Sequence, residues 1–307
     1  MKYAISLPNG HACGDPSSLG EFAALAEASG WDAIFLEDYI VWQGHSEAAT
    51  FDPWVALAAM AVKTRTIRLG TMVTPISRRR PWKLARETVS LDQLSAGRLT
   101  LGIGLGDNTI DTSFTSFGEE TDLKRRAEMT DEALQILAGL WSGKPFHFDG
   151  NYYQVKEVTF TPTPVQKPRI PIWIGGAWPL KGPTRRALRW DGACLYRLPP
   201  DDEMTPQDVR SLANAAREQR QPGTTFDICV GQATWQLNKD REAERAYIAA
   251  LAEAGATWWS LYVPPDSEEI MRRHIANGPL RINCPFFHFL FYNQGNHFFI
   301  FKKPAVF

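Results

Sequence analysis

The chain carries almost no net charge and has no long apolar run. Its 307 residues give a formal charge of −1, so no overall field draws it to nucleic acid or to an anionic membrane surface. No uninterrupted apolar stretch approaches the roughly 18–20 residues that a membrane-spanning helix needs. The N-terminus enters a predicted strand directly, with no small-residue cleavage site, so we expect no signal peptide and a cytoplasmic protein.

Cysteine is scarce, and the motifs of several catalytic classes are missing. The four cysteines lie far apart and form no CxxC pair, which favours reduced thiols over a disulfide framework or a zinc site. No cluster of His, Cys and carboxylate side chains occurs at the predicted strand ends, so we expect no metal. The sequence also lacks a GxSxG elbow and a GxxxxGKS phosphate loop.

Short β-rich apolar runs alternate with amphipathic stretches along most of the chain. The predicted strands are Tyr3–Leu7, Ala33–Glu37, Arg68–Val73, Leu99–Ile103, Ile172–Gly175, Ala193–Tyr196, Asp227–Gln232 and Trp258–Val263. The predicted helices between them are Ser18–Ser29, Pro53–Lys63, Trp82–Leu94, Leu123–Trp141, Thr184–Trp190, Pro206–Arg220, Arg241–Ala254 and Ser267–Ala276. Parallel strands need a crossover, usually a helix, so these strand–helix pairs predict a (β/α)8 TIM barrel. An open doubly wound sheet is the alternative.

Two segments depart from the alternation of strand and helix. Residues 143–171 hold an Asp149-Gly150 turn between aromatic and β-branched residues, which predicts a hairpin inserted after the fourth unit of the barrel. Residues 283–307 hold eight of the 17 phenylalanines. We therefore predict a single barrel domain over residues 1–282 and an atypical aromatic tail over 283–307. An interface tail, a strand pair and an out-of-frame extension remain open for that tail.

The predicted strand ends carry two glycine-rich loops. In barrels of this kind, functional groups gather at the carboxyl ends of the strands, and late-strand loops often bind phosphate. Gly175 and Gly176 fit such a loop, because glycine lets backbone N–H groups approach an anion closely. Gly102, Gly104 and Gly106 fit backbone contact with a flat or phosphorylated cofactor. A plain tight turn and close strand packing are the respective alternatives.

Few polar side chains at these strand ends are suited to chemistry. Asp107 is either a cap of the following turn or a proton donor and acceptor. Asp38 and Tyr39 end the second strand, where an acid orients its neighbours and a phenol donates a hydrogen bond to a reacting oxygen. Further candidates are loop histidines (His11, His45), a basic turn (Arg78, Arg79, Arg80) and indole walls for a ring-shaped cofactor (Trp42, Trp178). Asp92 and Arg98 are expected to close a helix end as an ion pair.

These segments together resemble the luciferase-like flavin and deazaflavin oxidoreductases. The resemblance is carried by AEASGWDAIFLEDY, DPWVALAAMAVKTRTIRLGTMVTP, RRRPWKLARETVSLDQLSAGRLTLGIGLG, HFDGNYYQV and PIWIGG. It covers most of the chain, and the block from Arg65 to Gly106 is highly specific. The resemblance implies a (β/α)8 barrel with an insertion after the fourth unit, usually a homodimer. It also implies reduced FMN or the deazaflavin coenzyme F420 at the carboxyl end of the barrel.

Individual residues take roles from this resemblance. Gly106, Gly175 and Gly176 match positions that contact the cofactor phosphate, and the Met72–Val73 bond matches a non-prolyl cis peptide behind the ring. Asp107 matches an acid of some deazaflavin dehydrogenases, and Trp42 matches a tryptophan near the ring. The chain departs from the family pattern after Asp38, because Tyr39 stands where many members carry a catalytic histidine.

The sequence therefore predicts an oxidoreductase that acts on a small organic molecule. Monooxygenation with reduced FMN and O2 is the leading hypothesis, on the breadth of the family. Hydride transfer with F420 is the alternative, favoured by Asp107 and Trp42. A cofactor-binding homologue with little catalysis is the third hypothesis, favoured by the missing histidine. The sequence does not identify the substrate.

Overall fold

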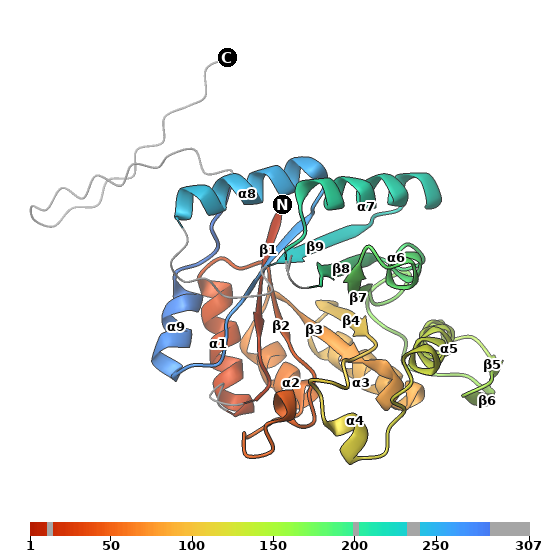
Figure 1. The fold of residues 1–307 in the computed structure, drawn as a ribbon. Helices are drawn as coiled ribbons and strands as arrows, with labels where there is room; N and C mark the ends of the chain where they lie inside the picture. Colours follow the sequence, from red (N-terminus) through yellow and green to blue (C-terminus); the bar gives the residue numbers. More distant parts are fainter. Residues whose placement is uncertain (11–14, 199–202, 232–239, 283–307) are drawn as a thin grey trace, which may run out of the picture.

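Eight parallel strands close into a barrel (Figure 1). The computed structural model describes residues 1–10, 15–198, 203–231 and 240–282. Around the barrel, the strand order is β1-β10-β9-β8-β7-β4-β3-β2, and every neighbouring pair is parallel. The strands are β1 (Lys2–Leu7), β2 (Ala33–Leu36), β3 (Arg68–Pro75), β4 (Leu99–Gly104), β7 (Ile172–Trp178), β8 (Gly192–Arg197), β9 (Asp227–Gly231) and β10 (Trp258–Tyr262). The predicted TIM barrel is confirmed, and the open doubly wound sheet is wrong.

Helices follow the strands and form the outer layer of the barrel (Figure 1). The long ones are α1 (Pro16–Ala28), α2 (Pro53–Lys63), α3 (Pro81–Leu94), α5 (Leu123–Trp141), α7 (Pro206–Gln219), α8 (Arg241–Ala254) and α9 (Glu268–Ala276). The short ones are η2 (Trp42–Gly44), η3 (Ile76–Arg78), α4 (Ser113–Ser116) and α6 (Lys181–Ala187). None of the helices in the described residues is both long and apolar enough to cross a membrane.

Side chains on the strands alternate between two apolar clusters. Ile34 and Leu36 of β2 point outward into the large core between the barrel and its helices. Phe35 points inward, because successive residues of a strand face opposite sides. Inside the barrel its ring lies 5.5 Å from that of Trp173, which lies 5.3 Å from that of Trp258. These three rings fill the amino-terminal part of the barrel, so the interior is a packed plug there.

The insertion between α5 and β7 is the predicted hairpin. Its strands β5 (Phe146–Asp149) and β6 (Gln154–Val158) pair antiparallel and lie beyond α5 at the edge of the molecule (Figure 1). The returning chain is held by Asp92 of α3, whose carboxylate accepts hydrogen bonds from Val165 N at 2.7 Å and from Gln166 Nε2 at 2.7 Å. The expected ion pair between Asp92 and Arg98 is wrong.

Arg98 instead donates to backbone carbonyls around the end of α2. Its guanidinium bonds the carbonyl oxygens of Ala61, Ile67 and Ser95 at 2.7–2.9 Å. It therefore holds the end of α2 and the turns at the end of α3 and before β3 together. Arg98 therefore closes the helix end as expected, but its partners are backbone carbonyls in place of a carboxylate.

The predicted tail over 283–307 and His11 lie outside the described residues.

Asp52 is the N-cap of α2, and its contribution to stability can be tested. Its carboxylate accepts from Trp54 N at 2.9 Å and Val55 N at 3.0 Å, and Pro53 occupies the first position of α2, where the predicted helix Pro53–Lys63 also begins. Asp52→Ala removes both bonds, so we expect the free energy of unfolding to fall by about 1 kcal/mol in urea titrations. Asp52→Asn keeps a capping oxygen and is the control. An Ala variant as stable as the Asn variant would contradict this role.

Candidate active site

The carboxyl ends of the strands surround two joined cavities. The first, of about 400 Å³, lies at the ends of β1, β8, β9 and β10, and we call it the β8–β10 cavity. The second, of about 480 Å³, lies at the ends of β4 and β7 with the loops that follow them, and we call it the β4–β7 cavity. Six residues line both of them: Glu37, Met72, Val73, Gly175, Gly176 and Tyr196. The two cavities therefore meet at one shared wall.

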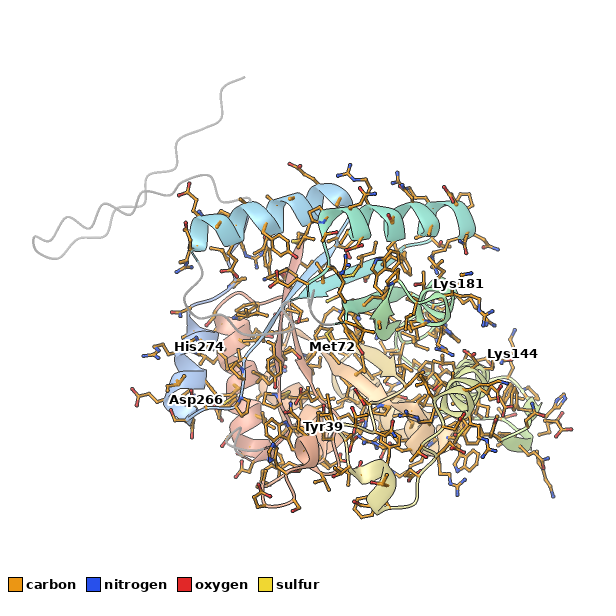
Figure 2. The ribbon with its side chains drawn as sticks, in the orientation of Figure 1. Tyr39, Met72, Lys144, Lys181, Asp266 and His274 are labelled. Carbon is orange, nitrogen blue, oxygen red and sulfur yellow. The ribbon has the colours of Figure 1, made fainter. Side chains whose placement is uncertain are left out.

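Most of the predicted site residues lie at these cavities. Met72, Val73, Gly175 and Gly176 form part of the shared wall, while Tyr39, Gly104, Gly106 and Asp107 line the β4–β7 cavity. Figure 2 places Met72 and Tyr39 toward the middle of the molecule, far from Lys144 beside the hairpin. Trp42 is not among the lining residues of either cavity. The predicted indole wall therefore does not face these two cavities.

A bulge in β3 builds the shared wall. The pairing of β3 with β4 shifts between Thr71 and Thr74, and the peptide bond between Met72 and Val73 is cis, as the resemblance implied. Val73 then covers the neighbouring strands. A Cβ at Gly104 would lie 2.4 Å from Val73 Cγ2, and one at Gly175 would lie 2.9 Å from Val73 Cγ1. Glycine is thus required there, and the part of the wall that Val73 and Gly175 form is apolar.

Gly106 in the loop after β4 is constrained in a different way. Its φ is +74°, which favours glycine, and a Cβ would lie 2.6 Å from Phe114 Cζ. Arg126 of α5 fixes the same loop by donating to the carbonyl oxygens of Leu105 and Gly106, both at 3.0 Å. It also donates to Asn108 Oδ1 at 2.9 Å. No motif in the sequence indicates this role of Arg126, because the residue lies on a helix about 20 residues beyond the loop that it binds.

The carboxylate of Asp38 is fully buried in a network of cations. Arg79 bonds it with two nitrogens at 2.6 and 3.1 Å, and Thr74 Oγ1 donates to it at 2.8 Å. Arg78 lies 3.3 Å from it and also bonds Asp111. Burial alone would raise the pKa of Asp38, but the two arginines and the hydrogen bonds lower it. Asp38 therefore stays ionised and holds the loops in position.

This network overturns the expectation for the basic turn. Arg78 and Arg79 do not form a solvated patch and do not reach out to an anion, since both are committed to Asp38. Only Arg80 of the three is exposed. The sequence alone could not show that Arg78 and Arg79 are buried, because their partner, Asp38, lies about 40 residues earlier in the chain.

Tyr39 and Asp107 both line the β4–β7 cavity. Asn9 positions the Tyr39 backbone, with Asn9 Nδ2 donating to the Tyr39 carbonyl oxygen at 2.8 Å. Burial raises the pKa of the Tyr39 phenol above its ordinary value, so the hydroxyl stays protonated at neutral pH. Asp107 is exposed, and its Oδ1 accepts from Thr109 N at 2.9 Å and Thr109 Oγ1 at 2.6 Å. It therefore caps the following turn.

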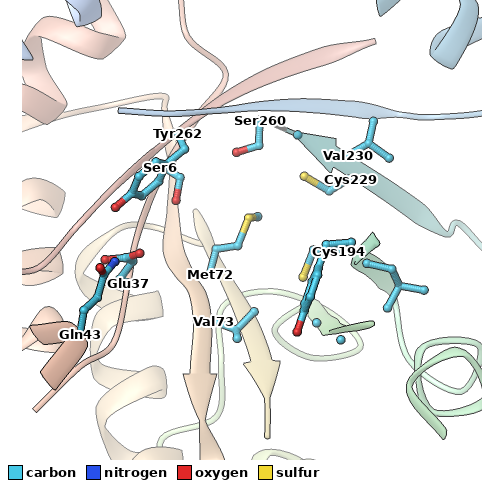
Figure 3. A pocket seen from close by; sticks show the side chains of 15 residues that line it. Ser6, Glu37, Gln43, Met72, Val73, Cys194, Cys229, Val230, Ser260 and Tyr262 are labelled. Atoms are coloured by element: carbon cyan, nitrogen blue, oxygen red, sulfur yellow. The ribbon is translucent and has the colours of Figure 1, made fainter. Parts of the chain in front are cut away.

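Glu37 is the site residue that sequence reasoning missed. It is partly buried in the wall that both cavities share, and its carboxylate accepts from Trp42 Nε1 at 3.0 Å and from the Tyr262 hydroxyl. Burial raises the pKa of Glu37 to about 7, and the two hydrogen bonds oppose that rise. Figure 3 shows Glu37, Gln43 and Tyr262 together on one side of the cavity, with Cys194 and Cys229 on the other.

The comparison with protein families decides which family this barrel belongs to. The family model described as "Luciferase-like monooxygenase" matches residues 1–297. The chain belongs to this family. Its resemblance to the luciferase-like oxidoreductases is thereby confirmed.

Proteins similar to this chain include F420-dependent dehydrogenases and a monooxygenase. An F420-dependent glucose-6-phosphate dehydrogenase of Microbacterium testaceum is 34% identical over 225 residues, which are 70% of this chain and 64% of that protein. An F420-dependent secondary alcohol dehydrogenase in complex with an F420-acetone adduct has a TM-score of 0.70 at 19% identity, covering 91% and 99% of the two chains. A monooxygenase from Streptomyces bottropensis has a TM-score of 0.69 at 20% identity, covering 90% and 96%.

The matches to curated relatives are partial. The chain spans about half to two thirds of the length of the curated relatives that it matches.

Within the described residues, no group of three or more His, Cys, Asp and Glu side chains is placed to hold a metal ion. The two cysteines that the structure describes, Cys194 and Cys229, are free thiols.

The Asp38 network gives this site a stability test. Arg78→Met leaves the buried carboxylates of Asp38 and Asp111 without one cation, and we expect the free energy of unfolding to fall by about 3–5 kcal/mol. Arg80→Met is the matched control on the exposed neighbour and should change it by less than about 0.5 kcal/mol. Urea unfolding measures both. Equal stability of the two variants would show that the network does not hold the site together.

Proposed function

We propose that this protein is an F420-dependent oxidoreductase that transfers a hydride between the deazaflavin and a small alcohol or carbonyl compound. The observation that carries the proposal is the wall of Met72 and Val73 that two cavities share. One cavity can hold a ring against this wall while the other holds a substrate beside it. The named relatives support F420 over FMN, because the dehydrogenases among them depend on F420.

The residues present fit such a cofactor. Gly104, Gly106, Gly175 and Gly176 line the β4–β7 cavity with backbone alone, and Val73 supplies an apolar surface for a flat ring. Gly175 and Gly176 would hold the phosphate through their backbone N–H groups. When bound, the deazaflavin accepts or supplies a hydride. The protein's own groups then bind the substrate and handle the proton.

Several site roles belong to the same proposal. Tyr39 would donate a hydrogen bond to a molecule bound in the β4–β7 cavity, because its hydroxyl stays protonated there. Asp38 would orient Tyr39 without touching the substrate, and Asp107 would shape the loop beside the cofactor. A homodimer in the cytoplasm is the expected form of the enzyme.

Monooxygenation with reduced FMN is the second candidate. The family model that matches the chain is described as a luciferase-like monooxygenase, which favours this candidate. The monooxygenase from Streptomyces bottropensis, at 20% identity, shares the fold alone. The tricyclic rings of F420 and FMN would both fit against the shared wall, so a binding measurement must decide between the two cofactors.

The first test is a titration of the purified protein with F420, FMN and reduced FMN by calorimetry. We expect F420 to bind at least tenfold more tightly than either form of FMN. Gly176→Ala should weaken F420 binding, because its Cβ would lie 2.6 Å from Pro183 Cβ at the cavity wall. Gly182→Ala meets no atom within 4 Å and is the control. Preference for reduced FMN would favour the monooxygenase, and binding of neither would remove both candidates.

A further inference from the structure

The position of Glu37 sets it apart from every other acid at the cavities. It follows Phe35 by two residues, so the alternation of β2 carries its side chain toward the barrel interior. It lines the β4–β7 cavity, where the cofactor is proposed, and equally the β8–β10 cavity beside it. Figure 3 shows its carboxylate among Ser6, Gln43 and Tyr262, the polar side chains on one side of the β8–β10 cavity.

Two hydrogen bonds fix the orientation of this carboxylate. Trp42 Nε1 donates to Glu37 Oε2 at 3.0 Å from η2, and the Tyr262 hydroxyl bonds it from the end of β10. The Trp42 ring is buried and stacks on His45, with the ring centres 5.6 Å apart. Both donors come from elements other than β2. A carboxylate held from two sides is preorganised for contact with a bound molecule.

Other ionisable groups at the cavities are poorly suited to exchange a proton at neutral pH. Asp38 stays ionised between two arginines, and the phenol of Tyr39 stays protonated. Burial raises the pKa of the Cys194 and Cys229 thiols, so neither forms a thiolate readily. Asp107 is exposed and committed to the turn at Thr109.

We propose that Glu37 is the acid–base residue of this site, and that it exchanges the proton of a substrate hydroxyl in the β8–β10 cavity. This inference rests on the proposed F420-dependent function. In the oxidation of an alcohol, the carbinol carbon gives its hydride to the deazaflavin and the hydroxyl gives its proton to the Glu37 carboxylate. The C–H and O–H bonds break, and a C=O bond forms. In the reduction of a carbonyl compound, the protonated Glu37 returns the proton.

The cavity also indicates the class of substrate. The polar side with Glu37 and Gln43 faces a less polar side with Cys194, Cys229 and Val230. A small uncharged secondary alcohol or ketone fits both sides, with its oxygen toward Glu37 and its carbon substituents on the less polar side. An anionic substrate would place its charge beside a buried carboxylate, which costs free energy by like-charge repulsion.

The protonation state of Glu37 determines how the rates of alcohol oxidation and carbonyl reduction depend on pH. The titratable groups that face Glu37 are Tyr262 from β10 and Tyr39 from the loop after β2, while Cys194, Cys229 and Tyr196 also line the β8–β10 cavity. Alcohol oxidation needs ionised Glu37, so kcat should rise with pH through about 7. Carbonyl reduction needs the protonated form, so kcat should fall with pH over the same range.

Glu37→Gln tests the assignment, because it keeps the shape and removes the titration. We expect kcat for a secondary alcohol to fall by about 10²–10⁴-fold and its pH dependence near 7 to vanish, while the Kd for F420 changes less than about threefold. Glu47→Gln is the matched control, since Glu47 is exposed in the adjacent loop. Infrared difference spectra of the cofactor-free protein should show a carboxyl that titrates near pH 7 in the wild type and is absent from Glu37→Gln.

The outcomes separate this inference from the proposed function. Retention of kcat and its pH profile in Glu37→Gln, with F420 still bound, would overturn the role of Glu37 and leave the proposed function standing. An infrared carboxyl band that titrates near pH 7 in both proteins would overturn it as well. Failure of the wild type to bind F420 in the same assays would overturn both together.

The two hydrogen-bond donors provide a second test that a merely structural role would not pass. Trp42→Phe and Tyr262→Phe each remove one hydrogen bond that lowers the pKa of Glu37. We expect the apparent pKa in the kcat profile for alcohol oxidation to move upward in both variants. The maximum kcat at high pH should fall by less than tenfold. A profile unchanged in both variants would contradict the assignment of the kinetic pKa to Glu37.

Discussion

The buried carboxylate of Asp38 is the group on which the geometry of this site depends. Through Arg78 and Arg79 it joins the end of β2 to the start of α3, and through Thr74 it joins the end of β3. Arg78 continues the network to Asp111 in the loop after β4. Three loops that carry candidate site residues are thus held by one set of charges. A buried ion pair adds little net stability, but the loss of one partner is costly, so the network specifies one arrangement.

The alternation of residues along β2 decides which acid has which role. Phe35 and Glu37 face the barrel interior, so Asp38 faces outward to the arginines. The sequence alone supports this reading, since a strand has a period of two. The predicted pair at the strand end is Asp38 and Tyr39, and Glu37 is not among the predicted site residues. The structure brings Glu37 and Trp42 together through η2, and no local pattern in the sequence predicts that contact.

The barrel itself could be predicted because its determinants are local. The eight strands, most of the helices, the Asp52 cap and the hairpin after Gly143 each follow from periodicity and turn residues within one segment. The partners of Arg78, Arg98 and Arg126 could not be predicted, because each bonds groups 18 to 40 residues away. Long side chains with many donors reach partners of any type, so the residue type does not reveal the contact.

The cost of Glu37 to the folded protein is consistent with a functional role. Its pKa is about 7 in the folded state against 4.5 as the ordinary value, so the folded chain binds more protons between these pH values. The contribution of this group to stability is therefore full below about pH 4.5 and is lost as pH rises toward 7. A leucine or glutamine at this position would cause no such loss of stability as the pH rises. A cavity that keeps a carboxyl near its point of half-ionisation makes both the acid and the base available at neutral pH, and a reversible alcohol and carbonyl interconversion needs both.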